Sequence, residues 1–414
     1  MKAWHFSENA YPYLPPADEY ESIRVSLPNR FYDPKKGAAL YDRYIDEWLV
    51  AEDEGVEIML NEHHQTATCV DPAAPLVLAA LARLTKRARL LILGNPVANR
   101  RQPVRVAEEM AMVDVLSKGR LECGFVRGVP YEVLPANSNP VRMNERQWEA
   151  MDLIVKAWTS HDGPVSHEGR FFHHRNINIW PRPYQQPHPP IWVSTTTPGG
   201  AARVGARAYV QATFLTGYRG TPAIYASYRK GWREAARGHD VPVNRLAYAA
   251  LLYAGESEAE ARAGAEKLLW YMTANKVPLH FCYPPGYVPT AMHAQILRGG
   301  GGRPACGEQS QCNRRERDRG RHHVCRHAGS GLPPDREDVQ PRRRFRTSLD
   351  HGSSRISRAR GDRARHQDLR ARSLSSAQGS VSRYGDFWPA RRNAGRAGDG
   401  VGAREHRGSR RVTG

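Results

Sequence analysis

Seven short apolar runs, each followed by a stretch with helical spacing, constrain the first 298 residues more than any other feature of this chain. The runs are nearly continuous rather than alternating, which is typical of parallel strands that are buried on both faces. The helical stretch between successive runs supplies the crossover that parallel strands require. We therefore predict strands near residues 3–6, 56–61, 89–96, 121–126, 190–195, 209–215 and 246–254.

The stretches between these runs carry apolar residues three and four positions apart, as amphipathic helices do. Asp71 followed by Pro72 predicts the start of one helix, with Asp71 as its N-cap. The pair Lys118–Gly119 predicts the end of another helix, because glycine adopts the left-handed conformation that closes one. The expected helices cover residues 38–55, 71–87, 102–120, 144–158 and 201–207.

The number of strand–helix units distinguishes the two common parallel architectures. An open doubly wound sheet usually has five or six strands, as in its best-known strand orders. Seven units over nearly 300 residues instead favour an α/β fold of the (β/α)8 TIM barrel type that lacks one unit. In such barrels the functional side chains lie at the C-terminal ends of the strands, so the residues that follow each apolar run are the candidates.

A turn rich in threonine and glycine follows the run at 190–195 and opens the next helix. It contains Thr196, Thr197, Gly199 and Gly200. The free N–H groups at a helix N-terminus bind phosphate, and the guanidinium of Arg127, after another strand, can clamp phosphate with two hydrogen bonds. The pattern predicts a phosphate site. A plain turn with an N-cap, beside a surface arginine, is the alternative.

Two further strand ends carry groups suited to a bound organic molecule. Gly94 allows close approach of the backbone, and Asn95 offers a side-chain amide to a polar heterocycle. His63 or His64 is suited to acid–base work, although a strand-end histidine is often only a structural hydrogen-bonding group. We expect no metal site, because adjacent residues of an extended strand point to opposite faces and the motif HExxH is absent.

The formal net charge of +19 is concentrated after residue 298. Residues 299–414 contain 27 Arg, no Lys and 12 acidic residues, a net charge of +15, whereas residues 1–298 have a net charge of only +4. The front segment therefore gives no electrostatic reason to expect nucleic acid as a partner. An arginine-rich arm that binds nucleic acid is the alternative from a different functional class, and it predicts binding with steep salt dependence.

The remaining composition favours a cytoplasmic protein with no membrane partner. The six cysteines lack the paired spacing of a secreted disulfide framework. The N-terminus has no apolar signal region, and no stretch approaches the length of a membrane-spanning helix. Cys306, Cys312 and Cys325 do not have the spacing of a zinc site.

The strand-end residues also carry a family resemblance. NEHHQ at 61–65 and the run RLLILGNPVANRRQPVRVAEEMAMVDVLSKGRLECGFVRG at 89–128 resemble bacterial luciferase and its flavin-dependent monooxygenase relatives. The resemblance covers residues 1–298 and is densest between 56 and 155. It implies a (β/α)8 barrel, in agreement with the strand count.

The resemblance implies an enzyme that uses reduced FMN and O2 to oxygenate a small organic substrate, with a separate flavin reductase as partner. It also implies a homodimer, since such relatives are often dimers. An oxidoreductase that uses the deazaflavin F420 on the same barrel is the nearest alternative. The flavin would do the difficult chemistry, while the protein positions it and excludes water.

The resemblance also assigns roles by position. His63 matches the catalytic histidine, and His64 is the second member of the pair. Gly94-Asn95 matches a cis peptide under the flavin ring, and Arg127 matches the arginine that binds the phosphate. The flavin pocket is further expected to include Tyr131, Thr196, Thr197, Gly199 and Gly200.

The arginine-rich tail lacks the last strand and helix that the resemblance implies. Text rich in Arg, Gly, Ala and Pro is typical of a GC-rich gene read out of frame. Codons permitted for residues 325–375, read from the second base, allow a helix, an apolar strand and a closing helix. We therefore predict a barrel over residues 1–298 and an out-of-frame, disordered tail over 299–414, with a frameshift near Arg298–Gly302. The chain as written would then be an incomplete barrel, with unpaired strand edges and no activity.

Overall fold

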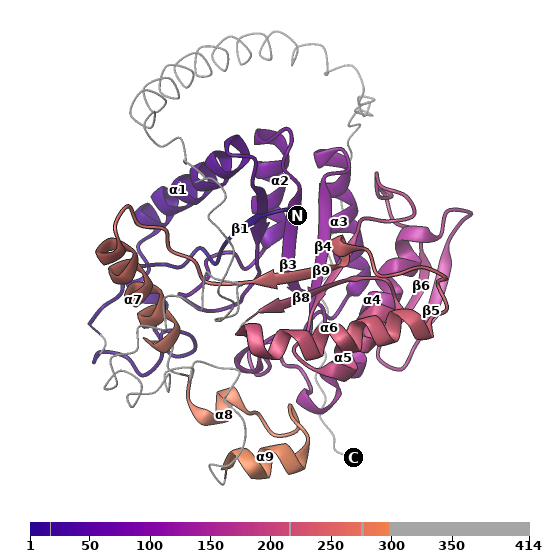
Figure 1. Cartoon of the computed structure of the whole chain (residues 1–414). Coiled ribbons are helices and arrows are strands. Elements are labelled where there is room, and N and C mark those ends of the chain that lie inside the picture. Colours follow the sequence, from indigo (N-terminus) through magenta and orange to yellow (C-terminus); the bar gives the residue numbers. More distant parts are fainter. Residues whose placement is uncertain (17, 215–216, 275–276, 298–414) are drawn as a thin grey trace, which may run out of the picture. The chain divides into compact units, whose positions relative to one another are not determined.

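The computed structural model describes residues 1–297 apart from 17, 215–216 and 275–276 (Figure 1). Its main sheet is parallel throughout, with the strand order β1-β2-β3-β4-β7-β8-β9. All seven predicted strands are confirmed, and the fold is the predicted α/β barrel type. The strands are β1 (Trp4–Ser7), β2 (Glu57–Leu60), β3 (Leu90–Pro96), β4 (Leu121–Val126), β7 (Ile191–Ser194), β8 (Val210–Phe214) and β9 (Leu246–Ala249).

Contacts between strands far apart in the sheet order show that the sheet curls. The rings of Trp4 on β1 and Trp192 on β7 lie 5.3 Å apart, edge to face. Phe6 on β1 and Phe214 on β8 lie 6.4 Å apart in the same manner. In a flat sheet three or more strand spacings of almost 5 Å would separate these residues. The curled sheet therefore encloses an apolar interior, as in a barrel.

Helices cover the outer face of the curled sheet (Figure 1). The buried sides of the helices form one continuous core with the outward side chains of the strands. The helices contribute large side chains such as Trp48 and Trp158 to this core. The helices that contribute to this core are α1 (Pro34–Asp53), α2 (Ala74–Leu84), α3 (Pro103–Ser117), α4 (Met143–Thr159), α5 (Pro198–Ala206) and α6 (Gly217–Glu234). Three further helices follow β9 in the chain: α7 (Glu258–Ala274), α8 (Leu279–Cys282) and α9 (Thr290–Leu297). Short 3-10 turns lie at Asn29–Phe31, Pro130–Glu132, Pro140–Arg142 and Val243–Arg245.

One predicted helix end is confirmed, and one predicted N-cap is wrong. Helix α3 ends at Lys118, which has a φ of 56°, followed by Gly119 with a φ of 81°. Helix α2 begins only at Ala74, and its N-cap Ala73 makes no side-chain capping bond. Asp71 is instead buried and accepts a hydrogen bond from the amide of Asn9, so its carboxylate is used by the β1 loop rather than by the helix.

An antiparallel hairpin between α4 and β7 was not predicted from the sequence. It consists of β5 (Val165–Glu168) and β6 (His173–Ile177). Its residues are largely polar and exposed, so they lack the apolar run that reveals the other strands. The carboxylate of Glu149 on α4 accepts hydrogen bonds from the backbone N–H groups of Phe171 and Phe172, which attaches the hairpin to the helix layer.

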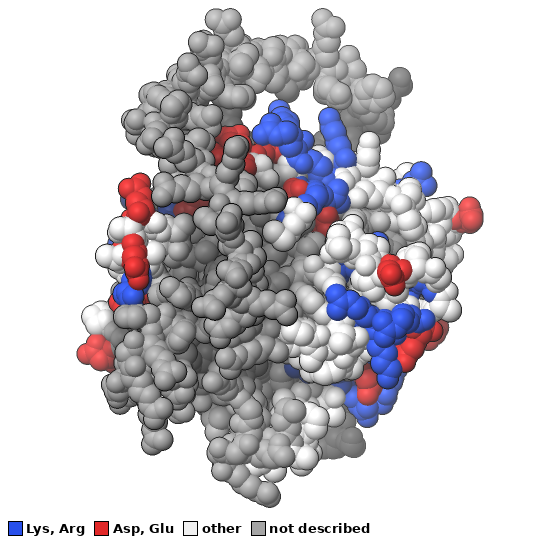
Figure 2. Space-filling view, viewed as in Figure 1, with Lys and Arg blue, Asp and Glu red and all other residues white. Residues whose placement is uncertain are grey.

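On the face drawn in Figure 2, the described residues include both acidic and basic side chains. Arg170 of the hairpin pairs with Glu145, and Arg207 after α5 pairs with Asp152. No helix among the described residues is long and apolar enough to cross a membrane. The tail and the proposed frameshift near Arg298–Gly302 lie outside the described residues.

Glu52, near the end of α1, is a stability determinant of the barrel. Its Oε1 accepts hydrogen bonds from the backbone N–H groups of Lys86, Arg87 and Ala88, at 2.8, 2.6 and 2.9 Å. Burial raises the pKa of this carboxyl, but the three N–H donors outweigh burial and leave the pKa below its ordinary value. The carboxylate thus fixes the turn between α2 and β3.

We expect Glu52→Ala to destabilise the fold by about 2–3 kcal/mol, because hydrogen bonds to a charged group are lost and the N–H donors lose their partner. Urea unfolding measures this change. The matched control is Glu54→Ala, two residues away and exposed, which should change stability by less than about 0.5 kcal/mol. Equal effects of the two variants would contradict the assignment.

Candidate active site

The register of the sheet brings the C-terminal ends of the strands to one edge. Leu60 of β2 lies beside Ile92 of β3, and Pro96 of β3 lies beside Val126 of β4. Phe125 of β4 lies beside Val193 of β7. His63, Arg127 and the threonine turn, on the loops after β2, β4 and β7, and Asn95, near the end of β3, therefore lie at the same edge of four neighbouring strands.

His63 forms a pair with a buried carboxylate. Its Nδ1 lies 2.8 Å from Oε1 of Glu132, a residue of the loop after β4 that is only 2% exposed. The same oxygen accepts a hydrogen bond from the backbone N–H of His64 at 3.0 Å. In the neutral imidazole this arrangement places the proton on Nδ1 and leaves Nε2 as the atom that can exchange a proton.

Glu8 and Arg24 complete the surroundings of His63. Glu8 directly follows β1, and its Oε1 lies 3.9 Å from Nε2 of His63. Arg24 lies 3.5 Å from the other oxygen of Glu8 and donates a hydrogen bond of 2.6 Å to the hydroxyl of Tyr131. The rings of Tyr131 and His63 lie 6.2 Å apart. Tyr131 therefore belongs to the same cluster as His63, and its predicted place in a flavin pocket stays a prediction.

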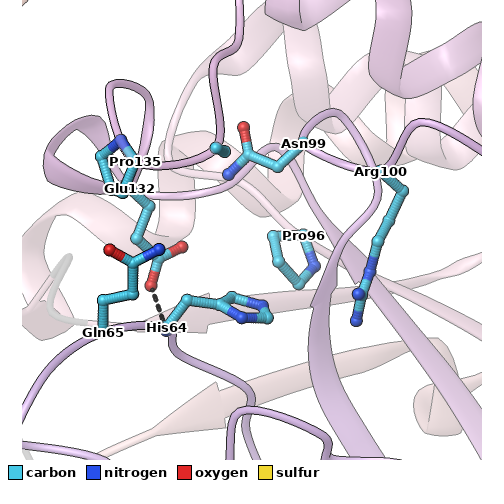
Figure 3. A pocket seen from close by; sticks show the side chains of 8 residues that line it. His64, Gln65, Pro96, Asn99, Arg100, Glu132 and Pro135 are labelled. Atoms are coloured by element: carbon cyan, nitrogen blue, oxygen red, sulfur yellow. Dashed lines mark hydrogen bonds between the residues drawn. The ribbon is translucent and has the colours of Figure 1, made fainter.

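His64 points into a different environment from His63. Its Nε2 lies 3.1 Å from Oε1 of Glu62, and this buried carboxylate also accepts a hydrogen bond from Arg100. A cavity of about 180 Å³ opens beside His64 (Figure 3). Its wall consists of His64, Gln65, Pro96, Asn99, Arg100, Glu132, Pro135 and Ala136.

Gly94 and Asn95 lie at the end of β3, within the edge that the other site residues share. Asn95 is fully buried, and among the described residues its Nδ2 has no hydrogen-bond partner. The cis peptide bond in this segment joins Leu93 to Gly94. The predicted bond between Gly94 and Asn95 is therefore wrong by one position.

Arg127 lies against an aromatic ring that comes from much later in the chain. Its guanidinium carbon is 3.8 Å from the centre of the Tyr287 ring. The Tyr287 hydroxyl donates a hydrogen bond of 2.7 Å to the carbonyl of Gly128, the residue after Arg127. These two contacts attach the segment around Tyr287 to the end of β4 and limit the positions that Arg127 can take.

The predicted threonine turn forms the N-terminus of α5. Thr197 is the N-cap, and its hydroxyl accepts a hydrogen bond from the N–H of Gly200 at 3.2 Å. Thr196 and Gly199 are exposed, and a side chain at Gly199 would meet nothing within 4 Å. The first turn of α5 is thus open to a ligand on the edge next to Arg127, since β4 and β7 are neighbours.

These groups fit a flavin nucleotide in chemical character. A buried amide without a partner suits the polar edge of a heterocycle, and a guanidinium beside an open helix N-terminus suits a phosphate. The 180 Å³ cavity is smaller than the 300–1,000 Å³ typical of pockets for larger ligands, so it does not account for the whole nucleotide. In the described part of the chain, no group of three or more His, Cys, Asp or Glu is arranged to hold a metal ion.

A larger groove of about 400 Å³ lies on the helix layer between α4, the hairpin and α5. Arg203 stacks on Trp148 there, 4.3 Å from the ring centre. The carboxylate of Glu149 in its wall already accepts hydrogen bonds from backbone N–H groups of the hairpin. The groove contains none of the predicted site residues and is part of the scaffold.

Several residues of the site were missed by reasoning from the sequence. Glu8 directly follows β1 and Glu132 lies six residues after the end of β4, so the rule that directs attention to strand ends applies to them as well. Arg100 follows β3 by four residues. Arg24 and Tyr287 lie in irregular segments far from these strands in sequence.

Asp71, behind the site, should make stability depend on pH. Burial raises the pKa of Asp71 to about 7; the hydrogen bond from Asn9 lowers it, and the charge of Glu62 raises it further. The pKa of an aspartate in the unfolded chain is about 3.9, so the native state binds the proton more tightly. The contribution of Asp71 to stability therefore falls as the pH rises from about 4 to 7.

We expect the titration of Asp71 to cost the parent chain roughly 1–3 kcal/mol of unfolding free energy between pH 5 and pH 8. In Asp71→Asn this loss should be absent. Urea unfolding at the two pH values measures the loss. The control is Asp42→Asn on the exposed side of α1, which should keep the pH dependence of the parent chain. An unchanged pH dependence in the Asp71 variant would show that this carboxyl is ionised in the native state.

A family model described as luciferase-like monooxygenase matches residues 25–331, which is more than half of the chain. The chain belongs to the luciferase-like monooxygenase family. The sequence resemblance is therefore confirmed. His63, Tyr131 and Glu132 lie within the matched region, whereas Glu8 and Arg24 precede it.

Two curated relatives illustrate the range of the family. The oxygenase component of flavin-dependent trigonelline monooxygenase from Acinetobacter baylyi is 34% identical over 173 residues, which is 41% of this chain and 47% of the relative. The alkanal monooxygenase beta chain of Photorhabdus luminescens is 30% identical over 142 residues, 34% of this chain and 43% of the relative. The chain matches less than half the length of these relatives.

Solved structures share the fold at low sequence identity. The monooxygenase RslO1 from Streptomyces bottropensis has a TM-score of 0.54 and 22% identity, covering 64% of this chain and 76% of that one. The oxygenating constituent of 3,6-diketocamphane monooxygenase from Pseudomonas putida, solved with FMN, has a TM-score of 0.51 and 17% identity, covering 72% and 78%. An F420-dependent secondary alcohol dehydrogenase has a TM-score of 0.51 and 20% identity, covering 72% and 82%.

Proposed function

We propose that this member of the family is an oxygenase that binds reduced FMN at the C-terminal edge of its sheet and oxygenates a small organic substrate with O2. The observation that carries the proposal is the pair of His63 with the buried Glu132, on the edge that also holds Arg127 and the open N-terminus of α5. Family membership supports the reaction class. The names of the trigonelline and diketocamphane relatives support the flavin.

The residues divide into two groups in this proposal. Arg127, Thr196, Thr197, Gly199 and Gly200 bind the phosphate. Asn95, beside Gly94, offers its Nδ2, which has no partner within the described part of the chain, to the flavin ring. His63 holds or moves a proton at Nε2, with Glu132 fixing the imidazole from the other side. His64 stays attached to Glu62 and shapes the wall of the adjoining cavity. Reduced FMN supplies the electrons that activate O2.

The decisive test is an anaerobic titration of the full chain with reduced FMN, followed by admission of O2 in the presence of trigonelline and related small heterocycles. We expect saturable binding of FMN and O2-dependent formation of an oxygenated product. Absence of FMN binding would overturn the proposal. Reduced F420 is titrated in parallel, because the dehydrogenase of similar fold uses that cofactor; preferential binding of F420 would favour a reductase or dehydrogenase instead.

We also propose a separate flavin reductase as the source of reduced FMN. The trigonelline relative is named as an oxygenase component, which is consistent with such a division. In the test above, product formation should require an added reductase with NADH, or chemically reduced FMN.

A homodimer through helices α2 and α3 completes the proposal. Leu76 on α2 and Met112 and Leu116 on α3 are 74%, 55% and 47% exposed, which is unusual for apolar side chains on two packed helices. We expect Met112→Glu combined with Leu116→Glu to convert a dimer to a monomer in light scattering. Val243→Glu, at a residue 91% exposed outside these helices, is the control and should remain dimeric. A parent chain that is already monomeric would contradict the dimer.

The frameshift is proposed on the sequence alone. Resequencing the gene across codons 290–330 tests it. If the gene differs from the given sequence by one extra or missing base near the glycine run that begins at Gly299, the corrected reading frame should encode a complete family sequence. If the reading frame is the same as in the given sequence, a sequencing error is excluded.

A further inference from the structure

The cavity beside His64 contains polar groups that the cluster around His63 does not use. Asn99 contributes to its wall, and neither Oδ1 nor Nδ2 of Asn99 has a hydrogen-bond partner among the residues that the structure describes. Glu132 shares that wall, and its Oε2 is equally buried and without a partner there. Buried polar atoms are rarely left unpaired in proteins, because each costs about 1–3 kcal/mol.

The Asn99 amide is placed by packing rather than by hydrogen bonds. Gly128 has a φ of 99°, and a Cβ at Gly128 would lie only 2.8 Å from Nδ2 of Asn99. A glycine at 128 therefore makes room for the amide. Figure 3 shows Asn99 facing the space that His64, Pro96 and Arg100 enclose from the other sides.

The volume of the cavity limits the size of its occupant. An engineered cavity of about 150 Å³ binds benzene, so 180 Å³ suits a single six-membered ring with one small substituent. A flavin nucleotide is much larger. The cavity is thus a site for a second molecule. The carboxylate of Glu132 separates the cavity from His63, because Glu132 contacts His63 and also forms part of the cavity wall.

The charges around the cavity favour a neutral occupant. The guanidinium of Arg100 is bound to the buried Glu62, which is not part of the cavity wall, so Arg100 offers little attraction to an anion in the cavity. An anion would also face the unpaired oxygen of Glu132, and a cation would face the guanidinium of Arg100. A neutral polar group avoids both costs of burying an unpaired charge.

The unpaired atoms then specify the polar group. Asn99 Oδ1 and Glu132 Oε2 are acceptors, and Asn99 Nδ2 is a donor. A primary carboxamide carries the complementary set, with two N–H donors and one carbonyl acceptor. The same set remains complementary if the oxygen and nitrogen of Asn99 are exchanged.

We propose that this cavity is a substrate subsite that binds a neutral, single-ring molecule through its primary carboxamide. Its identification as a substrate subsite rests on the proposed oxygenase function, whereas the binding itself does not. The class of ligand is an aromatic or heteroaromatic amide of benzamide size.

Calorimetric titration of the full chain with three probes of the same shape tests the proposal. Benzamide has both donors and the acceptor, acetophenone is neutral and lacks the donors, and benzoate lacks the donors and is negatively charged. We expect benzamide to bind at least about ten-fold more tightly than either of the others, since one hydrogen bond to a charged group contributes about 1.5–3 kcal/mol. Equal binding of benzamide and acetophenone, preference for benzoate, or no binding of benzamide would each overturn the proposal.

Asn99→Leu removes the amide while keeping most of the side-chain volume. We expect it to abolish the preference for benzamide over acetophenone, with the binding of acetophenone retained. The matched control is Asn144→Leu, at an exposed position on α4, which should keep the preference. Titration with FMN is run on the same samples, so failure of the amide site and failure of the flavin proposal give separate results.

Discussion

Replacing His63 by alanine is expected to lower the rate of product formation by about 100-fold or more, which is the usual contribution of a positioned acid–base group. The reason is the geometry at its two nitrogens. Nδ1 is fixed 2.8 Å from Glu132, and Nε2 remains for proton exchange, 3.9 Å from the nearest oxygen of Glu8. Binding of FMN should change little in this variant, because other loops carry the phosphate and ring contacts.

Glu132 should affect the proton-handling step through His63. Glu132→Gln keeps an oxygen that can accept from both Nδ1 of His63 and the N–H of His64, whereas Glu132→Ala loses both bonds. We therefore expect kcat to fall in the order parent, Gln variant, Ala variant. The KM should stay nearly constant for a substrate that lacks a carboxamide, because such a substrate makes no bond to Oε2 of Glu132. A merely structural role would instead lower thermal stability and kcat together in both variants.

The control for His63 is another histidine that pairs with a carboxylate. His173 of the hairpin lies 3.0 Å from Glu168, but it is exposed and belongs to the helix layer. His173→Ala should leave both kcat and FMN binding unchanged. A His63 variant that retains full activity would exclude His63 as the proton-handling group, even if FMN binding is confirmed.

The barrel was predictable because its strands are buried on both faces. Runs such as RLLIL and LECGFV are nearly continuous apolar segments, and the order of the main sheet follows the order of the chain, with only the hairpin left out. The hairpin itself was not predictable, since strands with alternating exposed polar residues have the composition of a loop. The N-cap at Asp71 failed for a related reason: a long-range partner, Asn9, uses the carboxylate, and local sequence does not reveal it.

The candidate site was predictable in its centre and not in its surroundings. Strand ends identified His63, Asn95 and Arg127, because parallel strands bring their C-terminal ends to one edge. The partners that fix these side chains come from elsewhere. Tyr287 lies 160 residues after Arg127 in the chain, and no pattern in either segment connects the two residues. Such pairs depend on how loops pack, which the spacing of apolar residues does not encode.

Replacing Arg127 by alanine is expected to weaken FMN binding by about 10- to 100-fold, because hydrogen bonds from a guanidinium to a phosphate contribute roughly 1.5–3 kcal/mol. Riboflavin, which has the same ring system without the phosphate, makes the test specific. Its affinity should be the same for the parent chain and the variant. An equal loss of affinity for both ligands would assign Arg127 to the fold or to the ring site rather than to the phosphate.

Tyr287 should position Arg127 through its ring rather than through its hydroxyl. The ring lies 3.8 Å from the guanidinium carbon, a cation–π contact that contributes about 1–2 kcal/mol when shielded from solvent. We therefore expect Tyr287→Ala to weaken FMN binding several-fold and to leave riboflavin binding unchanged, whereas Tyr287→Phe keeps the ring and stays near the parent.

The matched control is a second arginine stacked on an aromatic ring. Arg203 lies 4.3 Å from the ring centre of Trp148, but on the helix layer, in the groove that contains no predicted site residue. Arg203→Ala should reduce stability slightly and leave FMN affinity unchanged. If Arg127→Ala and Arg203→Ala have the same effect on FMN, the loss comes from weakened packing, and the phosphate is bound by the N-terminus of α5 without Arg127.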